Sequence, residues 1–403
     1  MTSTKECIEL ENEYGAKNYN PLDVVISKGK GIWVEDVEGN RYMDFLASYS
    51  ALNQGHNHPR LVKALQKQAE KLSLTSRAFR NDQLPYFEKE LCELTGYEMM
   101  LPMNSGAEAV ETALKAARKW GEKVKGVGKD KGEIIVCSGN FHGRTITIVS
   151  MSDEEQYRDG FGPFTPGFKI IEYNNVSALQ DAINENTVAF MVEPIQGEGG
   201  VVVPDDGYMQ KVEKVCRDNN VLLIADEIQS GLGRTGKMFA CDHEHVKPDM
   251  ITIGKALSGG MYPISAVVGS AEVLGVFNPG DHGSTYGGNP IASAVGRESL
   301  KVIVEDELCE RSAELGEYFM AELEKIESPY VDFVRGKGLW IGVVLKQAAR
   351  PFCKALMKKG ILAKDTHGNV IRIAPPLVIE KEEIDQALTA IEEVLTDESF
   401  DKE

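Results

Sequence analysis

The chain has 403 residues, of which 42% are apolar and 26% are charged, and these ordinary proportions for a soluble globular protein exclude a disordered chain. At about 150 residues per domain, this length corresponds to two or three domains, or to one large α/β domain with additions. Lysine and arginine number 44 against 62 aspartates and glutamates, so the net charge is −18. Such an acidic chain repels phosphate backbones and argues against nucleic-acid binding, although a local arginine can still hold a small anion.

The sequence predicts a cytoplasmic protein without a membrane span. Residues 1–11 contain neither an apolar run nor an arginine-rich amphipathic pattern, so we expect neither a secretory signal nor an organellar transit peptide. No stretch approaches the ~20 consecutive apolar residues that a membrane-spanning helix needs. The cysteines include no C-x-x-C pair and are typical of reduced, mostly buried thiols.

Short apolar runs alternate with helical patterns over most of the chain. Strand-like pieces at 31–36 and 41–45 lie between turns, and helical patterns follow at 59–72, 108–120 and 207–219. Buried strands are predicted at four apolar runs: 134–137, 188–192, 221–225 and 264–268. Strands that alternate with helices indicate βαβ units, and hence an α/β fold with a mainly parallel sheet covered on both faces.

The pattern changes near residue 290. Helical segments dominate to about 326, strand-like pieces follow at 339–345 and 370–373, and an acidic helix begins at Lys381. This order is typical of a smaller α+β domain. The basic, glycine-flanked stretch 121–132 is expected to form a surface loop.

Two local motifs have a competing explanation. Residues 231–236 match the dinucleotide fingerprint G-x-G-x-x-G, but they do not open a helix directly after a strand, and Met238 stands where a P-loop needs a hydroxyl for Mg²⁺. Cys241, His243 and His245 would share one side of a strand, as metal ligands do. Because no second cluster completes a tetrahedral set, we expect a polar loop there and predict no metal site.

Three pieces of sequence carry the chemistry. One buried strand runs into Asp226 and Glu227, at the edge where α/β sheets collect ligands, although a cap or a salt bridge is the default for one such pair. Lys255 ends another strand among apolar residues, where burial would lower its pKa and make it a carbonyl-reactive amine, although most lysines are solvated. Residues 104–109 lead into a helix whose N-terminus favours a phosphate, although Ser105 could be a simple N-cap.

Together these pieces supply a phosphate cup, a carboxylate for a protonated pyridine nitrogen and a lysine for an aldehyde, which pyridoxal phosphate requires. The stretch Asp226-Glu-Ile-Gln-Ser-Gly-x-Gly-Arg-Thr-Gly, with Lys255 following Asp226 by 29 residues, resembles the class III (ω-amino acid) aminotransferases. The resemblance covers nearly the whole chain and includes four further motifs: Gly55-His-x-His-Pro59, Asn104-Ser-Gly-Ala-Glu-Ala109, Glu193-Pro-Ile-Gln-Gly197 and Gly283-Ser-Thr-Tyr-Gly-Gly-Asn-Pro290.

The resemblance implies a fold-type I transferase, in which a large domain with a mainly parallel seven-stranded sheet is followed by a smaller α+β domain. It divides the chain into an N-terminal segment, 1–50, that contributes to the small domain and the active site, a large cofactor-binding domain, 51–290, and a C-terminal domain, 291–403. It also implies a homodimer, or a higher assembly, with active sites at the subunit interface.

The same resemblance implies a set of cofactor contacts. Lys255 would bond covalently to the cofactor aldehyde, and Asp226 would lie on the pyridine nitrogen. The other cofactor residues would be the phosphate ligands Ser105, Gly106 and Ala107, the stacking residue Phe141, Glu193, the ring-hydroxyl partner Gln229, and Thr285, which would reach the phosphate in the neighbouring subunit.

Within the class, several stretches are similar to the members that act on ornithine: residues 15–22, 45–56, 74–79, 140–145 and 371–376. Members that act on acetylornithine usually carry a more apolar segment where this chain has Ser48-Tyr-Ser. The chain departs from the ornithine-specific pattern at His142, where a larger aromatic is frequent, and we expect this to reshape only the pocket wall. Acetylornithine, 4-aminobutyrate and lysine stay open as donors, and a catalytically silent binding protein is the alternative from another class.

The resemblance assigns five residues to ornithine and to 2-oxoglutarate. Arg144 would clamp the α-carboxylate of ornithine, Tyr19 would bond its α-amine and Tyr49 would shape the pocket, so that the δ-amine meets the cofactor. Arg372 would hold 2-oxoglutarate, and Glu198 would pair with Arg372 while ornithine reacts. Ornithine would leave as glutamate 5-semialdehyde, which closes to pyrroline-5-carboxylate. Without the resemblance, the simplest interpretation is that the two arginines are surface charges, the glutamate is a loop carboxylate and the two tyrosines are core aromatics.

Overall fold

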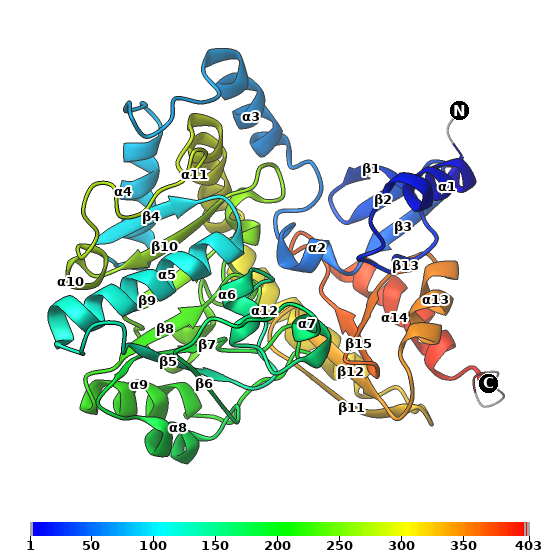
Figure 1. Cartoon of the computed structure of the whole chain (residues 1–403). Coiled ribbons are helices and arrows are strands. Elements are labelled where there is room, and N and C mark those ends of the chain that lie inside the picture. The colour runs from blue at the N-terminus through cyan, green and yellow to red at the C-terminus, as the bar shows by residue number, and fades with distance from the viewer. Residues whose placement is uncertain (1–2, 399, 401–403) are drawn as a thin grey trace.

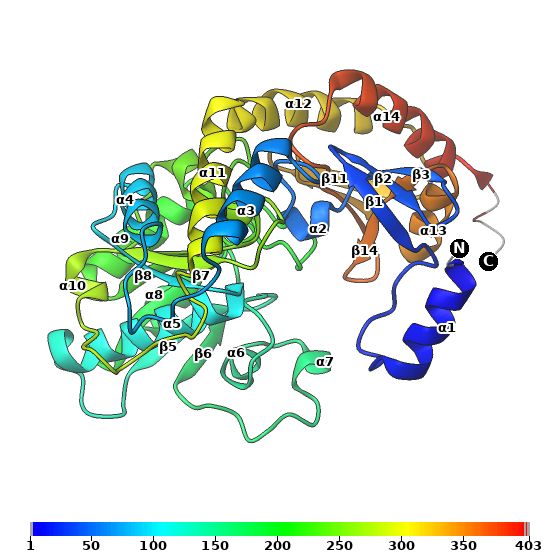
Figure 2. The same cartoon turned by 90° about the horizontal axis from the view of Figure 1, so that it is seen from above.

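The computed structural model describes residues 3–398 and 400, whose elements form a larger and a smaller body (Figure 1). The larger body is built around one long sheet with helices on both faces. The first and last helices, α1 (Thr4–Tyr14) and α14 (Lys381–Leu395), both belong to the smaller body (Figure 2).

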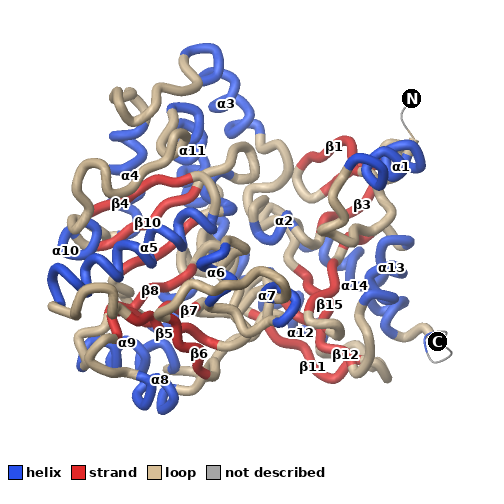
Figure 3. Tube along the Cα trace, viewed as in Figure 1, coloured by secondary structure: helices blue, strands red, loops and turns tan. Residues whose placement is uncertain are grey.

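The sheet of the larger body has seven strands and is mainly parallel, which confirms the predicted α/β architecture (Figure 3). Its order is β4-β10-β9-β8-β7-β5-β6, in which only the pairs made by β10 are antiparallel. The strands are β4 (Met99–Met103), β5 (Glu133–Cys137), β6 (Phe168–Ile171), β7 (Thr187–Val192), β8 (Leu222–Asp226), β9 (Met250–Ile253) and β10 (Ser265–Gly269).

Successive residues of the central strands face two different cores. On β8, Leu222 and Ile224 belong to the core under α5 (Gly106–Trp120), while Leu223 and Ala225 belong to the core on the opposite face, with residues of α9 (Tyr208–Asp218). Strands buried on both faces must be apolar at every position, which is why they read as continuous apolar runs in the sequence.

The remaining helices of the larger body enclose this sheet and its edges. They are α3 (Pro59–Lys71), α4 (Leu84–Thr95), α6 (Ile146–Ser150), α7 (Glu155–Arg158), α8 (Val176–Ala182), α10 (Ala271–Leu274) and α11 (Pro290–Glu305). Helix α11 packs against α3 and α4, so that the start and the end of the larger body meet along one side (Figure 1).

The smaller body contains two four-stranded sheets. One has the order β1-β2-β3-β13 and the other the order β11-β12-β15-β14. Their strands are β1 (Ile26–Lys30), β2 (Trp33–Asp36), β3 (Arg41–Asp44), β13 (Ile361–Leu362), β11 (Val331–Gly336), β12 (Ile341–Leu345), β15 (Val370–Ile373) and β14 (Lys364–Thr366). The accompanying helices are α2 (Ala47–Ser50), α12 (Leu308–Leu323) and α13 (Arg350–Lys358). Because β13 pairs with β3, the ends of the chain share a sheet, while the proposed domain limits stay a prediction.

Most predicted strands and helices are confirmed, and two predicted loops are not. The stretch 121–132 begins with a π-helical turn, Gly121–Lys125, that continues α5, and a Cβ atom on Gly121 would lie only 2.2 Å from Val188 Cγ1. Residues Ala240–Glu244 form a 3-10 helix, so Cys241 and His243 do not lie on a strand. Within the described residues, no cluster of three His, Cys, Asp or Glu side chains is placed to hold a metal, and no helix has both the length and the apolar composition to cross a membrane.

Candidate active site

A cavity of about 190 Å³ lies at the carboxyl ends of the parallel strands, where the loops after β5, β7, β8 and β9 meet the start of α5. This edge is where open α/β sheets bind ligands. Seven of the residues predicted to hold the cofactor line the cavity: Gly106, Ala107, Phe141, Glu193, Asp226, Gln229 and Lys255.

Lys255 follows β9 and has a left-handed backbone, with φ of 46°. Its pKa falls from the ordinary 10.5 to about 8, because burial disfavours the ammonium more than the charges of Glu198 and Asp226 favour it. A neutral amine is therefore available near physiological pH, as a carbonyl-reactive lysine requires.

Asp226 is the last residue of β8, and three donors fix its carboxylate. Oδ1 accepts hydrogen bonds from Ile228 N–H at 3.1 Å and from Thr252 Oγ1–H at 3.0 Å, and Oδ2 accepts one from His142 Nδ1 at 2.7 Å. Thr252 is the register partner of Asp226 on β9, which is why its hydroxyl reaches the carboxylate.

His142 does more than shape the pocket wall. Because a carboxylate only accepts, Nδ1 carries the hydrogen, and the other ring nitrogen is buried without a partner in the described part of the chain. Burial lowers the pKa of His142, but the hydrogen bond and the charge of Asp226 outweigh it, so the net shift is upward. No local pattern signals this contact, because residues 138–145 lie in an irregular loop.

The start of α5 combines a cap with free backbone donors. Ser105 is indeed an N-cap: its Oγ accepts from Glu108 N–H at 3.2 Å, and Glu108 Oε2 accepts from Ser105 N–H at 2.8 Å. This capping box leaves the N–H groups of Gly106 and Ala107 without partners among the residues that the structure describes. The cap and the predicted anion site are therefore compatible.

The walls of the cavity hold an aromatic ring, a carboxyl group and an amide. Phe141 N–H donates to Glu193 Oε2 at 2.9 Å. Burial raises the pKa of Glu193 to about 7, and Asp226 adds to this rise while His142 opposes it. Gln229 Nε2 is buried without a partner within the described residues, so this donor remains for a bound molecule.

These groups fit pyridoxal phosphate. Free N–H groups at the start of α5 match its phosphate, the Gln229 amide matches its ring hydroxyl, Asp226 matches its pyridine nitrogen and Lys255 matches its aldehyde.

Arg372 and Glu198 form a largely buried ion pair beside the cavity. The Arg372 side chain on β15 is 1% exposed, and its Nη1 lies 2.8 Å from Glu198 Oε1 while its Nη2 donates to Gly197 O at 3.1 Å. Burial raises the pKa of Glu198, but the charge and hydrogen bond of Arg372 outweigh it, and Lys255 lowers it further. The pair therefore acts electrostatically on the reactive amine.

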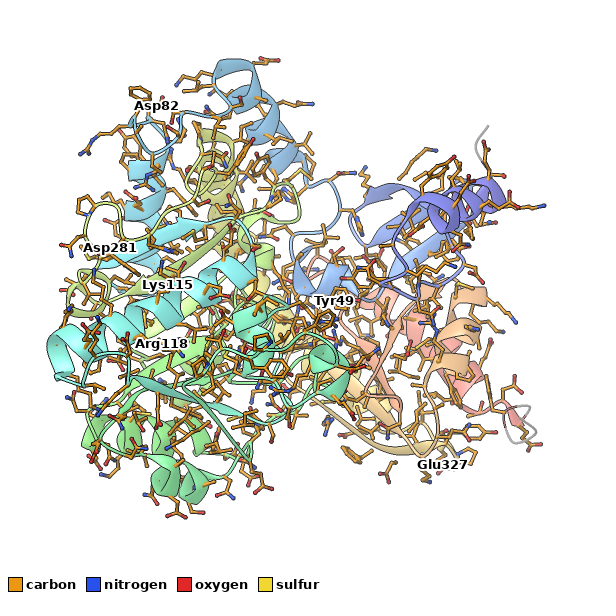
Figure 4. The ribbon with its side chains drawn as sticks, in the orientation of Figure 1. Tyr49, Asp82, Lys115, Arg118, Asp281 and Glu327 are labelled. Carbon is orange, nitrogen blue, oxygen red and sulfur yellow. The ribbon has the colours of Figure 1, made fainter. Side chains whose placement is uncertain are left out.

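Tyr49 reaches this pair from a strained turn. All four residues of α2 have positive φ angles, between 47° and 70°, a left-handed conformation that costs about 1 kcal/mol or more per residue. Asp44 Oδ1 holds the turn by accepting from the N–H groups of Leu46 and Ala47, each at 2.9 Å. The turn places the Tyr49 ring 5.5 Å from the Arg372 guanidinium, at the junction of the two bodies (Figure 4).

The other predicted substrate and cofactor residues are exposed and do not line this cavity. Tyr19 is 76% exposed. Burial and the charge of Glu198 raise the pKa of the Tyr49 hydroxyl, and Tyr19 adds to this rise. Arg144 is exposed and its guanidinium lies 3.9 Å above the Tyr157 ring. Thr285 is exposed and does not line the cavity of its own chain.

A larger surface hollow, of about 860 Å³, is lined by Lys115 and Arg118 on the C-terminal half of α5 and by Asp281 on the loop after α10 (Figure 4). The cavity at the N-terminus of the same helix is the candidate site, because it alone of the two contains the predicted cofactor residues.

Comparison with known proteins identifies the family of this chain. The model of the aminotransferase class-III family matches residues 14–395. A curated ornithine aminotransferase of Geobacillus sp. (strain WCH70) is 60% identical over 395 residues, which are 98% of this chain and 99% of the relative.

Two solved structures are similar over nearly their whole length. The ornithine aminotransferase from Toxoplasma gondii ME49 has a TM-score of 0.97 and 46% identity, covering 98% of this chain and 95% of that chain. An acetylornithine aminotransferase from Elizabethkingia anophelis has a TM-score of 0.90 and 46% identity, covering 98% and 99%. The range matched by the family model, 14–395, spans nearly the whole chain, and the chain belongs to the class-III aminotransferase family.

Proposed function

We propose that this enzyme transfers the δ-amino group of L-ornithine to 2-oxoglutarate, giving glutamate 5-semialdehyde, which closes to pyrroline-5-carboxylate, and glutamate. The full-length similarity to curated ornithine aminotransferases carries the proposal. The structural support is the largely buried Arg372–Glu198 pair with the Tyr49 ring beside it.

Pyridoxal phosphate is the cofactor, and when bound it supplies an aldehyde for the amine and a ring that withdraws electrons. Lys255 would hold the aldehyde and, once freed by the substrate amine, would move the proton from the substrate carbon with its Nζ. Asp226, oriented by His142 and Thr252, would keep a proton on the ring nitrogen. Gly106 and Ala107 would hold the phosphate with their N–H groups.

Tyr19 and Arg144 would decide which amine of ornithine reacts. Tyr19 would accept a hydrogen bond from the α-amine of ornithine, and Arg144 would bind the α-carboxylate, so that only the δ-amine would reach the cofactor aldehyde. The turn that carries Tyr49 would close this side of the pocket. These roles are our proposal, supported by the position of the Arg144 guanidinium 5.6 Å from the ring of Phe141, which lines the cavity.

The Arg372–Glu198 pair would separate the two half-reactions. While ornithine reacts, Glu198 neutralises the Arg372 guanidinium, which would otherwise repel the cationic donor. The dicarboxylate 2-oxoglutarate would replace Glu198 on Arg372, because a second carboxylate offsets the loss of a partly buried pair.

Replacement of Glu198 by Gln tests this separation. We expect the ornithine half-reaction to lose at least about tenfold in rate over Kd, because Arg372 stays unneutralised, while the half-reaction with glutamate is retained. Both are measured by stopped-flow absorbance of the bound cofactor. Glu185→Gln, at an exposed position away from the site, serves as the control. Equal losses in both half-reactions would contradict the proposed separation.

The pH dependence of cofactor capture tests the environment of Lys255. Since its pKa is lowered to about 8, the ammonium predominates below pH 8 and the reactive amine above it. The rate at which the stripped enzyme captures pyridoxal phosphate should rise with pH and level off above about pH 8.5, whereas an ordinary lysine would give a roughly tenfold rise per unit up to about pH 10. A capture rate that continues to rise up to about pH 10 would show that Lys255 is not desolvated.

A second donor has structural support. The acetylornithine aminotransferase from Elizabethkingia anophelis is as similar in sequence as the Toxoplasma gondii enzyme. Paired assays with ornithine and N-acetylornithine, with 2-oxoglutarate as acceptor, distinguish the two. Glutamate formation is measured with both donors, and pyrroline-5-carboxylate is trapped with ornithine. A strong preference for the acetylated donor, which lacks a free α-amine, would reject the proposed function and the role of Tyr19.

We also propose that the enzyme is a cytoplasmic homodimer. The exposed position of Thr285 supports a role in the partner's site, since it does not line the cavity of its own chain. The free thiols of all seven cysteines support a reducing compartment.

A further inference from the structure

The segment 16–21, which carries Tyr19, lies on the surface with little to hold it. Every residue from 16 to 21 is exposed. Within the described residues, the hydrogen bonds that join this segment to the rest of the chain all come from one side chain, Arg350. A residue that recognises a substrate must be held in place by surrounding contacts, so the position of Tyr19 depends on the hydrogen bonds from Arg350.

Arg350 is the first residue of α13 and uses both ends of its guanidinium. Nη2 donates to Asn20 O at 2.8 Å and to Pro21 O at 3.1 Å, while Nη1 donates to Asp365 Oδ1 at 3.1 Å. The side chains of Arg350 and Asp365 are only 23% and 22% exposed. The planar guanidinium thus donates hydrogen bonds to two successive carbonyl groups, while the Asp365 carboxylate fixes its orientation. A lysine ammonium group cannot reproduce this arrangement.

Asp365 connects this attachment to the ion pair in the site. It lies on β14, which pairs with β15, and in this register Lys364 is opposite Arg372. The next residue, Thr366, donates its hydroxyl to Glu198 O at 2.7 Å. The strand that orients Arg350 therefore also contacts both members of the Arg372–Glu198 pair.

We propose that Arg350 is a positioning residue, which fixes Tyr19 over the pocket by clamping the segment 16–21 to β14. The inference rests on the proposed function, because Tyr19 has a task only if the donor carries a free α-amine. Loss of the clamp should therefore harm the reaction of ornithine. It should spare the reaction of glutamate, which Arg372 would hold through a carboxylate without help from Tyr19.

The test compares holoenzyme variants by two measurements. Arg350→Met removes the clamp, Arg350→Lys keeps the charge without the planar guanidinium, and Lys354→Met removes an exposed charge from the same helix as a matched control. Stopped-flow absorbance gives the half-reactions with ornithine and with glutamate. Limited trypsin digestion reports the mobility of the segment through cleavage after Lys17.

Arg350→Met should lower the rate over Kd for ornithine by about tenfold, leave glutamate within about twofold, and speed cleavage after Lys17. Arg350→Lys should recover part of each effect, and Lys354→Met should match the wild type. Three results for Arg350→Met would each overturn the inference. They are an unchanged rate over Kd for ornithine, an equal loss of rate with ornithine and glutamate, and unchanged trypsin cleavage after Lys17. A wild-type enzyme that reacts with glutamate but not with ornithine would instead contradict the proposed function.

Discussion

Replacement of Lys255 by Ala is expected to reduce transamination by at least about a thousandfold, because the variant loses both the bond to the cofactor and the group that moves the proton. The measurement is steady-state turnover of ornithine and 2-oxoglutarate without added amine, together with the absorbance of the bound cofactor. Full activity in this variant would refute the assignment of Lys255.

The fold should survive this substitution. The Lys255 amine is buried and its pKa is lowered, so its charged form is destabilised in the native state and a methyl group in its place removes that penalty. Lysine and alanine both carry a Cβ atom, so the backbone strain from the positive φ angle at position 255 is unchanged. The melting temperature should therefore not fall. The exposed Lys237→Ala serves as a control and should retain wild-type turnover.

Replacement of Asp226 by Asn is expected to cost a hundredfold or more in turnover, on the order of the loss of one electrostatic contact to a reacting group. An amide carries no negative charge to keep a proton on the ring nitrogen. Its NH₂ group would also face one of the three donors that now converge on the carboxylate, from His142, Ile228 and Thr252.

The cofactor should still bind to the Asp226→Asn enzyme, since Lys255 and the start of α5 are intact, and absorbance would confirm occupancy. Thr252→Val deletes one donor and leaves the charge, so it should cost less than Asp226→Asn. If the two variants lost activity equally, the charge of Asp226 would not be its contribution.

The elements that leave a local pattern in the sequence can be predicted from it. The strand that ends at Asp226 is a continuous apolar run, and the small residues before Glu108 mark a helix start, so both were predictable. The pairing of Lys255 with Asp226 across one cavity follows from the rule that parallel strands end at the same edge. The roles given to Arg144, Tyr19 and Arg372 came from resemblance, because charge and aromaticity alone do not distinguish a pocket residue from a surface residue.

What the sequence could not predict depends on contacts between distant segments. His142 meets Asp226 from an irregular loop, and Arg350 meets Asn20 from the other end of the chain, so neither contact leaves a periodic trace. The π-helical turn after Trp120 depends on the close approach of Gly121 to Val188. Local propensity predicted a loop there, and tertiary packing decided otherwise.

The left-handed turn from Ala47 to Ser50 also bears on laboratory evolution of this enzyme. Glycine adopts such angles without steric conflict, so screening for heat resistance alone would favour glycine at Ser48. The resulting protein would have a higher melting temperature, but its Tyr49 side chain would be more mobile. Turnover would therefore decline as thermal stability increased. Selection that rewards turnover and survival together would be needed to keep this costly backbone in place.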